Sequence, residues 1–96
     1  MLRVRNHIVN SETTNYLAIP VGGKIISFTC LYDSDSLRCC SVGDDSGPMQ
    51  QVRVLVVSTD SSIDAYVAPN DNLRFIDTAE DYNSGTLYHA FEVTAS

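Results

Sequence analysis

The chain has 96 residues, 44% of them hydrophobic, and its twelve acidic and six basic side chains give a formal net charge of −6. This length suits one domain with a modest core, which we place at residues 1–96. The acidic balance disfavours nonspecific binding to DNA, RNA or an anionic membrane. No apolar run approaches the about 20 residues that span a bilayer, and the first nine residues do not resemble a signal peptide. We therefore expect a cytoplasmic protein, in the host cytoplasm if its origin is viral.

The three cysteines, Cys30, Cys39 and Cys40, do not have the pattern of a disulfide framework. They cannot all pair, and neighbouring residues on a strand point to opposite faces. The spacings that bind zinc, such as Cys-x-x-Cys, are missing. We expect the cysteines to be reduced and to pack as small buried hydrophobic residues, and we expect the chain to bind no metal and no cofactor.

The first segment alternates apolar and mostly basic residues, which predicts a half-buried strand. Its two sets are Leu2, Val4 and Ile8 against Arg3, Arg5 and His7. Asn10-Ser11 should end this strand, and we expect a polar loop at residues 12–15.

Residues 16–32 are the longest apolar stretch, and the Gly22-Gly23 pair divides it into two extended halves. Two adjacent glycines favour a hairpin turn, because glycine readily adopts a positive φ. Pro20 lacks a backbone N–H, so the first half should be an edge strand. The second half carries apolar residues on both faces and should be a central strand.

A turn cluster at residues 33–36 leads to a strand at residues 37–42 and to a loop at residues 43–48, where every residue is a turn former. Residues 51–58 read as a second central strand. Its faces carry Val52, Val54 and Val56 on one side and Arg53, Leu55 and Val57 on the other.

The remaining segments are short. We predict strands at residues 65–67, 73–76 and 87–93, and a loop at residues 77–85 with room for one helical turn at residues 78–82. The apolar spacing of an amphipathic helix is missing throughout. The sequence thus predicts an all-β fold, a small antiparallel sandwich or partly open barrel of about seven short strands.

Three segments carry a family pattern: residues 19–27 read Ile-Pro-Val-Gly-Gly-Lys-Ile-Ile-Ser, residues 53–59 read Arg-Val-Leu-Val-Val-Ser-Thr, and residues 87–93 read Leu-Tyr-His-Ala-Phe-Glu-Val. Together they resemble a family of small phage and prophage domains of unknown function. That family opens with leucine-proline-x-glycine-x-lysine-isoleucine-leucine, has a glycine-threonine-glycine-histidine turn after its middle strand, and closes with histidine-x-phenylalanine-glutamate. The resemblance implies a viral origin and covers most of the chain from Tyr16 onward.

Two departures limit what the resemblance implies. The turn at residues 58–63 reads Ser-Thr-Asp-Ser-Ser-Ile, without the family's glycines or histidine, and the strand at residues 37–42 lacks the expected tryptophan. No role of those family positions is carried over to this chain.

The sequence does not predict an enzyme. Its serines and aspartates gather in turns, where turn chemistry explains them, and His7 and His89 are the only bases that titrate near neutral pH. His89 on an apolar strand face fits a packed, hydrogen-bonded histidine better than a catalytic base or a metal ligand.

The arginines are more informative. Arg3, Arg5, Arg53 and Arg74 lie in predicted strands rather than in loops. A guanidinium group suits phosphates and carboxylates, and a neighbouring tyrosine ring could hold a base. The alternatives are cross-strand ion pairs for the arginines, and core packing or a subunit contact for the tyrosines. The candidate ligand-binding residues are Arg53, Arg74, Tyr66, Tyr88, His89 and Thr59.

These features suggest a noncatalytic phage-type binding protein. We expect a homo-oligomeric sponge that sequesters a small anionic ligand, a nucleotide immune signal, and so counters host defence. The alternative is a protein-binding inhibitor or adaptor that docks on a basic host protein through an acidic surface, and a structural component of the virion comes third. The acidic residues of that surface are Asp33, Asp35, Asp44, Asp45, Glu80 and Asp81.

Overall fold

The computed structural model describes residues 1–31 and 36–95. These residues form seven β-strands and one short 3-10 helix. The elements are β1 (Leu2–Val9), β2 (Thr13–Pro20), β3 (Lys24–Cys30), β4 (Leu37–Asp44), β5 (Met49–Ser58), η1 (Ile63–Ala65), β6 (Asn72–Glu80) and β7 (Leu87–Thr94). The all-β prediction is confirmed, and the turn cluster predicted at residues 33–36 lies, except for Ser36, outside the described residues.

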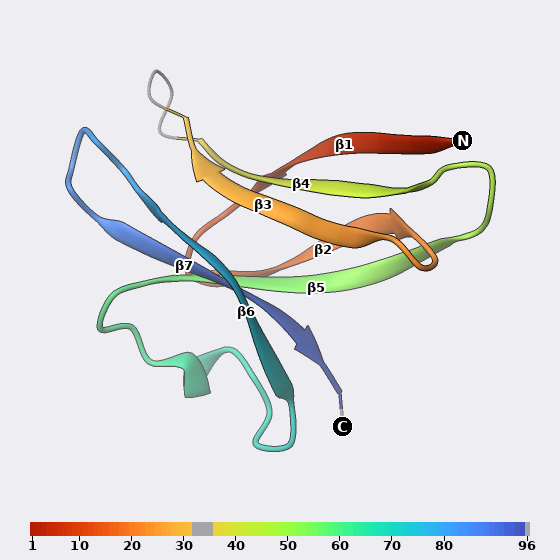
Figure 1. Cartoon of the computed structure of the whole chain (residues 1–96). Helices are drawn as coiled ribbons and strands as arrows, with labels where there is room; N and C mark the ends of the chain where they lie inside the picture. The colour runs from red at the N-terminus through yellow and green to blue at the C-terminus, as the bar shows by residue number, and fades with distance from the viewer. Residues whose placement is uncertain (32–35, 96) are drawn as a thin grey trace.

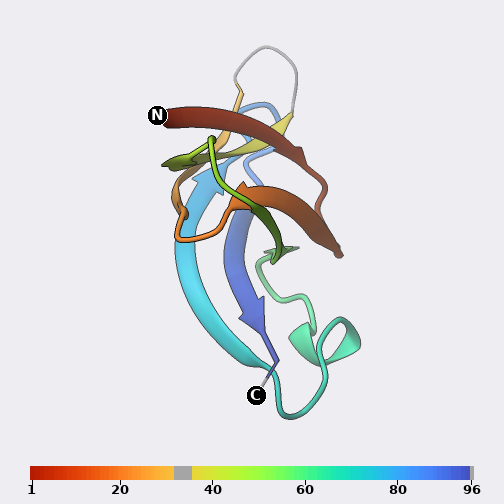
Figure 2. The same ribbon diagram turned by 90° about the vertical axis from the view of Figure 1, so that its right-hand side faces the viewer.

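The strands form two antiparallel sheets that face each other (Figures 1 and 2). We call the three-stranded sheet, of order β1-β4-β3, the small sheet, and the four-stranded sheet, of order β2-β5-β7-β6, the large sheet. The two sheets do not close into a barrel. The predicted antiparallel sandwich is therefore the architecture of this chain.

Strand β5 organises the core, because both of its faces are buried. Val54 and Val56 point between the sheets, where they pack with residues such as Ile19 and Phe28. On the outer face of the large sheet, Leu55 and its neighbours form a second, smaller cluster. This outer cluster consists of Leu55, Val57 and Val93, with Ile63, Tyr66, Val67 and Phe91 packed against it. The prediction of β5 as a central strand with two apolar faces is confirmed.

The predicted hairpin at Gly22-Gly23 is wrong, because β2 and β3 belong to different sheets. Gly22 does take a positive φ of 84°, and the N–H of Gly23 donates to the carbonyl of Pro20 at 2.8 Å. The turn carries the chain across the sandwich. Ile19 and Ile25 therefore meet the same core from opposite sheets and do not share a ladder. As predicted, β2 is an edge strand.

Strand β3 is also an edge strand, contrary to the prediction that it is central; β4 lies at the centre of the small sheet. A β-bulge between Ile25 and Ser27 shifts the register against β4. The extra residue turns Ile26 to solvent and lets both Ile25 and Phe28 point inward. The apolar residues on both faces of this segment therefore mark a bulge and not a central strand.

Three smaller predictions also change. The apolar row of β1 is exposed rather than half-buried, because none of the described elements covers that face of the small sheet. Strand β6 continues to Glu80, so the predicted helical turn at residues 78–82 does not form, and the predicted strand at residues 65–67 is replaced by η1 and an irregular segment. Within the described residues, no helix is long and apolar enough to cross a bilayer.

Candidate functional site

The large sheet splits at one end, and we call this split the fork. The ladder between β5 and β7 stops at the pair Arg53 and Val93. Beyond it, β5 continues along β2 as far as Met49, while β7 continues along β6 to Thr94 (Figure 1). The turn at residues 21–23 and the loop at residues 45–48 tie β2 and β5 to the small sheet at this end. Figure 1 shows the β2–β5 and β6–β7 ribbons, the two prongs of the fork, running apart at this end, in keeping with strand twist.

A pocket of about 670 Å³ lies in the fork. Its polar lining comes from both prongs and from the segment between β5 and β6, and includes Gln50, Arg53, Tyr66, Asp71, Glu92 and Thr94. Small-molecule sites usually measure about 300–1,000 Å³ and combine apolar walls with a few polar groups. The fork pocket has the size and the mixed lining of such a site.

Arg53 lines this pocket with its charge already compensated. One guanidinium nitrogen lies 3.5 Å from the Oδ1 atom of Asp71. The Asp71 side chain is only 9% exposed, and its Oδ2 atom accepts the N–H of Ala68 at 2.9 Å. Arg53 therefore holds the segment before β6 against β5, while the rest of its guanidinium faces the pocket region.

Arg74 makes the cross-strand ion pair that the sequence offered as the alternative to ligand binding. It lies directly opposite Glu92 in the β6–β7 ladder, and a guanidinium nitrogen approaches the Glu92 carboxylate at 3.0 Å. Glu92 lines the pocket, whereas Arg74 does not. The two ion pairs leave the pocket close to neutral rather than basic.

Tyr66 lines the pocket from the irregular segment after η1, and Glu12 holds it there. The Tyr66 hydroxyl donates to the Oε2 atom of Glu12 at 3.2 Å. The other carboxylate oxygen accepts the Ser58 N–H and hydroxyl, both at 2.8 Å, and the Ser61 hydroxyl at 2.9 Å. These donors, the Ser58 N–H first, lower the pKa of Glu12, while burial and the nearby carboxylate raise the pKa of Tyr66.

His89 and Thr59 lie together, but away from the fork. The Nε2 atom of His89 lies 2.8 Å from the Thr59 hydroxyl, and Nδ1 lies 2.9 Å from the Thr78 hydroxyl. Both ring nitrogens are thus occupied, as in a packed, hydrogen-bonded histidine. A hydroxyl, rather than a carboxylate, stands in the position that would orient a catalytic base. Tyr88 lies on the other face of β7 and packs against the core between the sheets.

The sequence model of a domain of unknown function, DUF7352, matches residues 1–96. The chain belongs to this family. No curated protein and no solved structure matches it.

In this DUF7352 chain the six candidate residues do not converge on one site. Arg53 and Tyr66 share the fork pocket, and Arg74 is linked to it through Glu92. The other three candidates, Thr59, His89 and Tyr88, contact other parts of the large sheet.

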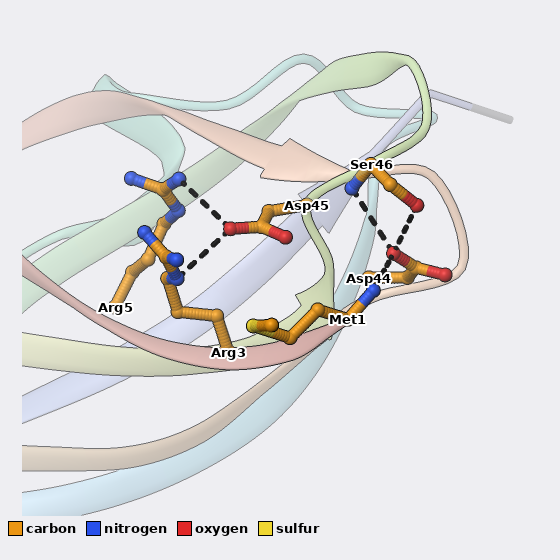
Figure 3. A network of polar contacts seen from close by, with 6 residues as sticks. All are labelled: Met1, Arg3, Arg5, Asp44, Asp45 and Ser46. Atoms are coloured by element: carbon orange, nitrogen blue, oxygen red, sulfur yellow. Dashed lines mark hydrogen bonds and ion pairs between the residues drawn. The ribbon is translucent and has the colours of Figure 1, made fainter.

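The acidic residues predicted to bind a protein partner do not form one free surface in this DUF7352 chain. Asp44 accepts the Met1 ammonium group at 2.8 Å and the Ser46 hydroxyl at 2.6 Å, and these contacts hold its pKa well below the usual range (Figure 3). Asp45 binds Arg3 at 2.8 Å and lies 3.7 Å from Arg5. Of the other predicted members, Asp81 is buried, Glu80 is exposed, and Asp33 and Asp35 lie outside the described residues.

Sequence reasoning missed the residues that position the pocket. Glu12 lies in the predicted polar loop, yet it has a positive φ of 57° and accepts hydrogen bonds from residues more than forty positions away. Asp71 lies between the strands predicted at residues 65–67 and 73–76 and is not among the candidate residues, yet it is the partner of Arg53. Neither role has a local sequence signal, because both depend on contacts between distant segments.

Proposed function

We propose that this DUF7352 chain is a noncatalytic binding protein that holds a small ligand in the fork pocket. One observation supports this above all: β5 and β7 separate beyond the pair Arg53 and Val93, while β5 stays paired with β2 and β7 stays paired with β6. The separation exposes strand edges and polar side chains in a single hollow. Such a preformed hollow with converging polar groups is the usual form of a small-molecule site.

The ligand that we propose is a nucleotide immune signal, sequestered in the host cytoplasm by a protein of phage type. The Arg53 guanidinium touches Asp71 through one nitrogen at 3.5 Å, which leaves N–H groups for a phosphate. The Tyr66 ring lines the same pocket and supplies a surface for a base. The family resemblance described above supports the viral setting.

The charge of the pocket sets a condition on this ligand. The Asp71 carboxylate already binds part of the Arg53 guanidinium group that a phosphate would need. Glu92 adds a second carboxylate to the lining of the pocket. A phosphate must therefore displace Asp71 from Arg53 or bind at the remaining guanidinium edge. Removing the Asp71 charge should strengthen the binding of a nucleotide, although it breaks an ion pair.

The test is the melting temperature (Tm) of the purified protein with a panel of cyclic dinucleotides and cyclic ADP-ribose isomers. A ligand at about 100 times its dissociation constant adds about 2.7 kcal/mol to stability. In a domain of this size, that stabilisation raises Tm by about 10 °C or more. We expect one nucleotide to give such a shift, R53Q to abolish it, and D71N to lower the dissociation constant.

R5Q is the matched control, because it removes the same charge from an arginine on β1, outside the fork pocket. It should leave the ligand-induced shift unchanged. A panel in which no nucleotide raises Tm would contradict the nucleotide proposal. A single stoichiometric host protein, captured by the chain and released by salt, would then favour the inhibitor or adaptor.

A further inference from the structure

The sandwich has four edge strands among its described residues, and three of them carry a feature that blocks pairing with another strand. Strand β2 ends in Pro20, which has no N–H to donate. Strands β3 and β6 each contain a β-bulge, at Ile25–Ser27 and at Phe75–Asp77. Bulges and prolines are the usual protection of an exposed sheet edge.

Strand β1 has no such protection. All eight of its residues pair with β4 in one continuous register, from Leu2 opposite Asp44 to Val9 opposite Leu37. Its other edge faces away from β4 and presents regular backbone N–H and C=O groups over about 26 Å, at 3.3 Å per residue. Among the other described edge strands, only β2 pairs over the same length without a register shift, and β2 ends in Pro20.

The face of β1 that points away from the core is exposed and carries three apolar side chains, with Asn6 between Val4 and Ile8. Leu2, Val4 and Ile8 are 75%, 61% and 67% exposed. Val42 lies opposite Val4 on the neighbouring strand and continues the apolar surface across the small sheet. A free edge and an exposed apolar row thus occur on the same strand.

The charge around this edge also permits a second copy of the chain to approach. The net charge of −6 opposes association over most of the surface. At β1, however, Arg3 and Arg5 are the charged side chains of the strand, and Asp45 binds both of them (Figure 3). The edge is therefore close to neutral in an otherwise acidic molecule.

We propose that β1 pairs antiparallel with β1 of a second copy across a two-fold axis. The two small sheets then form one continuous six-stranded sheet. In the register centred on Arg5, Leu2 of one copy lies opposite Ile8 of the other and Val4 lies opposite Asn6, so the exposed faces of the two strands meet on one side of the sheet with an apolar pair at each end. The two Arg5 side chains approach each other in this register, and the Asp45 carboxylates offset their repulsion. The fork lies on the large sheet, so the pairing leaves the pocket open and does not depend on its ligand.

Sedimentation velocity over a range of concentrations tests this pairing. We expect a dimer for the unmodified chain, and a dimer dissociation constant at least about tenfold higher for V4K, because a lysine on an edge strand opposes pairing. V21K is the matched control: Val21 is 57% exposed and lies in the turn after β2, so its dimer should persist. Equal Tm values for V4K and V21K, measured at a concentration low enough for both to be monomeric, would show that V4K does not act through folding.

Amide hydrogen exchange gives a second measurement. Every other amide of β1 should be protected in the dimer and should exchange quickly in V4K, while the amides of β4 should change little. A monomer at all concentrations would overturn the proposal. So would a dimer that V4K leaves intact, because its interface would then lie on another surface.

Discussion

At the scale of single residues, Glu12 connects distant parts of the chain. Its carboxylate accepts hydrogen bonds from Ser58, Ser61 and Tyr66, and its φ is 57°. A non-glycine residue with a positive φ carries backbone strain, which the surrounding contacts must offset. Here the contacts are those that hold the segment after β5 over the outer cluster and place Tyr66 at the pocket.

We predict that E12A lowers the free energy of unfolding by about 2 kcal/mol, because the Ser58 N–H loses its charged acceptor. E12G loses the same hydrogen bonds but relieves the strain at positive φ, so it should be more stable than E12A by about 0.5–1 kcal/mol. Urea unfolding of the two variants measures both effects. If E12G were the less stable of the two, the strain at this residue would not exist.

At the scale of elements, the turn between β2 and β3 decides how the two sheets are connected. Gly22 supplies the positive φ, and Gly23 supplies close approach. A Cβ atom at Gly23 would lie 2.9 Å from the Pro20 carbonyl oxygen and 3.0 Å from that of Val42. The backbone of β2 and that of β4 therefore pack directly against this glycine, where the chain passes from one sheet to the other.

We predict that G23A destabilises the protein by about 2 kcal/mol or more, since two of the three closest atoms are backbone oxygens that cannot turn away and the third belongs to the buried Ile19 side chain. G47A is the control, because a Cβ atom there has no neighbour within 4 Å. Its stability should stay within about 0.5 kcal/mol of the unmodified chain. Thermal unfolding followed by circular dichroism compares the two. A G23A variant as stable as G47A would contradict the close approach.

At the scale of the whole molecule, stability should depend on pH in two windows. Burial, with a smaller effect of Arg5, lowers the pKa of His7 below its ordinary 6.5, and hydrogen bonds lower the pKa of Glu12 below 4.5. In both cases the unfolded chain takes up the proton at a higher pH than the folded chain does. The free energy of unfolding must therefore fall as the pH is lowered through each window.

The prediction is a first loss of stability as the pH falls below about 6.5 and a second below about 4.5. H7Q should remove the first loss, and E12Q should weaken the second, which Asp44 shares because its pKa is also lowered. Urea unfolding at a series of pH values provides the measurement. A stability that rises on acidification would have the wrong sign for both groups.

Much of the fold could be predicted from local pattern. The alternation in β5 predicted both of its buried faces, Pro20 marked an edge strand, and the strand predicted at residues 87–93 forms as β7. The candidate site was predictable only in part. Arg53 and Tyr66 meet at one pocket, but the ion pairs with Asp71 and Glu92 that set its charge could not be foreseen.

The sequence by itself determined that this chain folds as strands, because side chains that alternate between polar and apolar are matched only by a period of two. Only the tertiary structure decided which strands share a sheet, which edges stay free and where the large sheet divides. A glycine pair permits a turn, but it does not determine whether the next strand joins the same sheet. A bulge moves every residue after it to the opposite face of the sheet. Those choices depend on packing between segments that are distant in the sequence, as at Gly23 against β4 and at Glu12 against Tyr66.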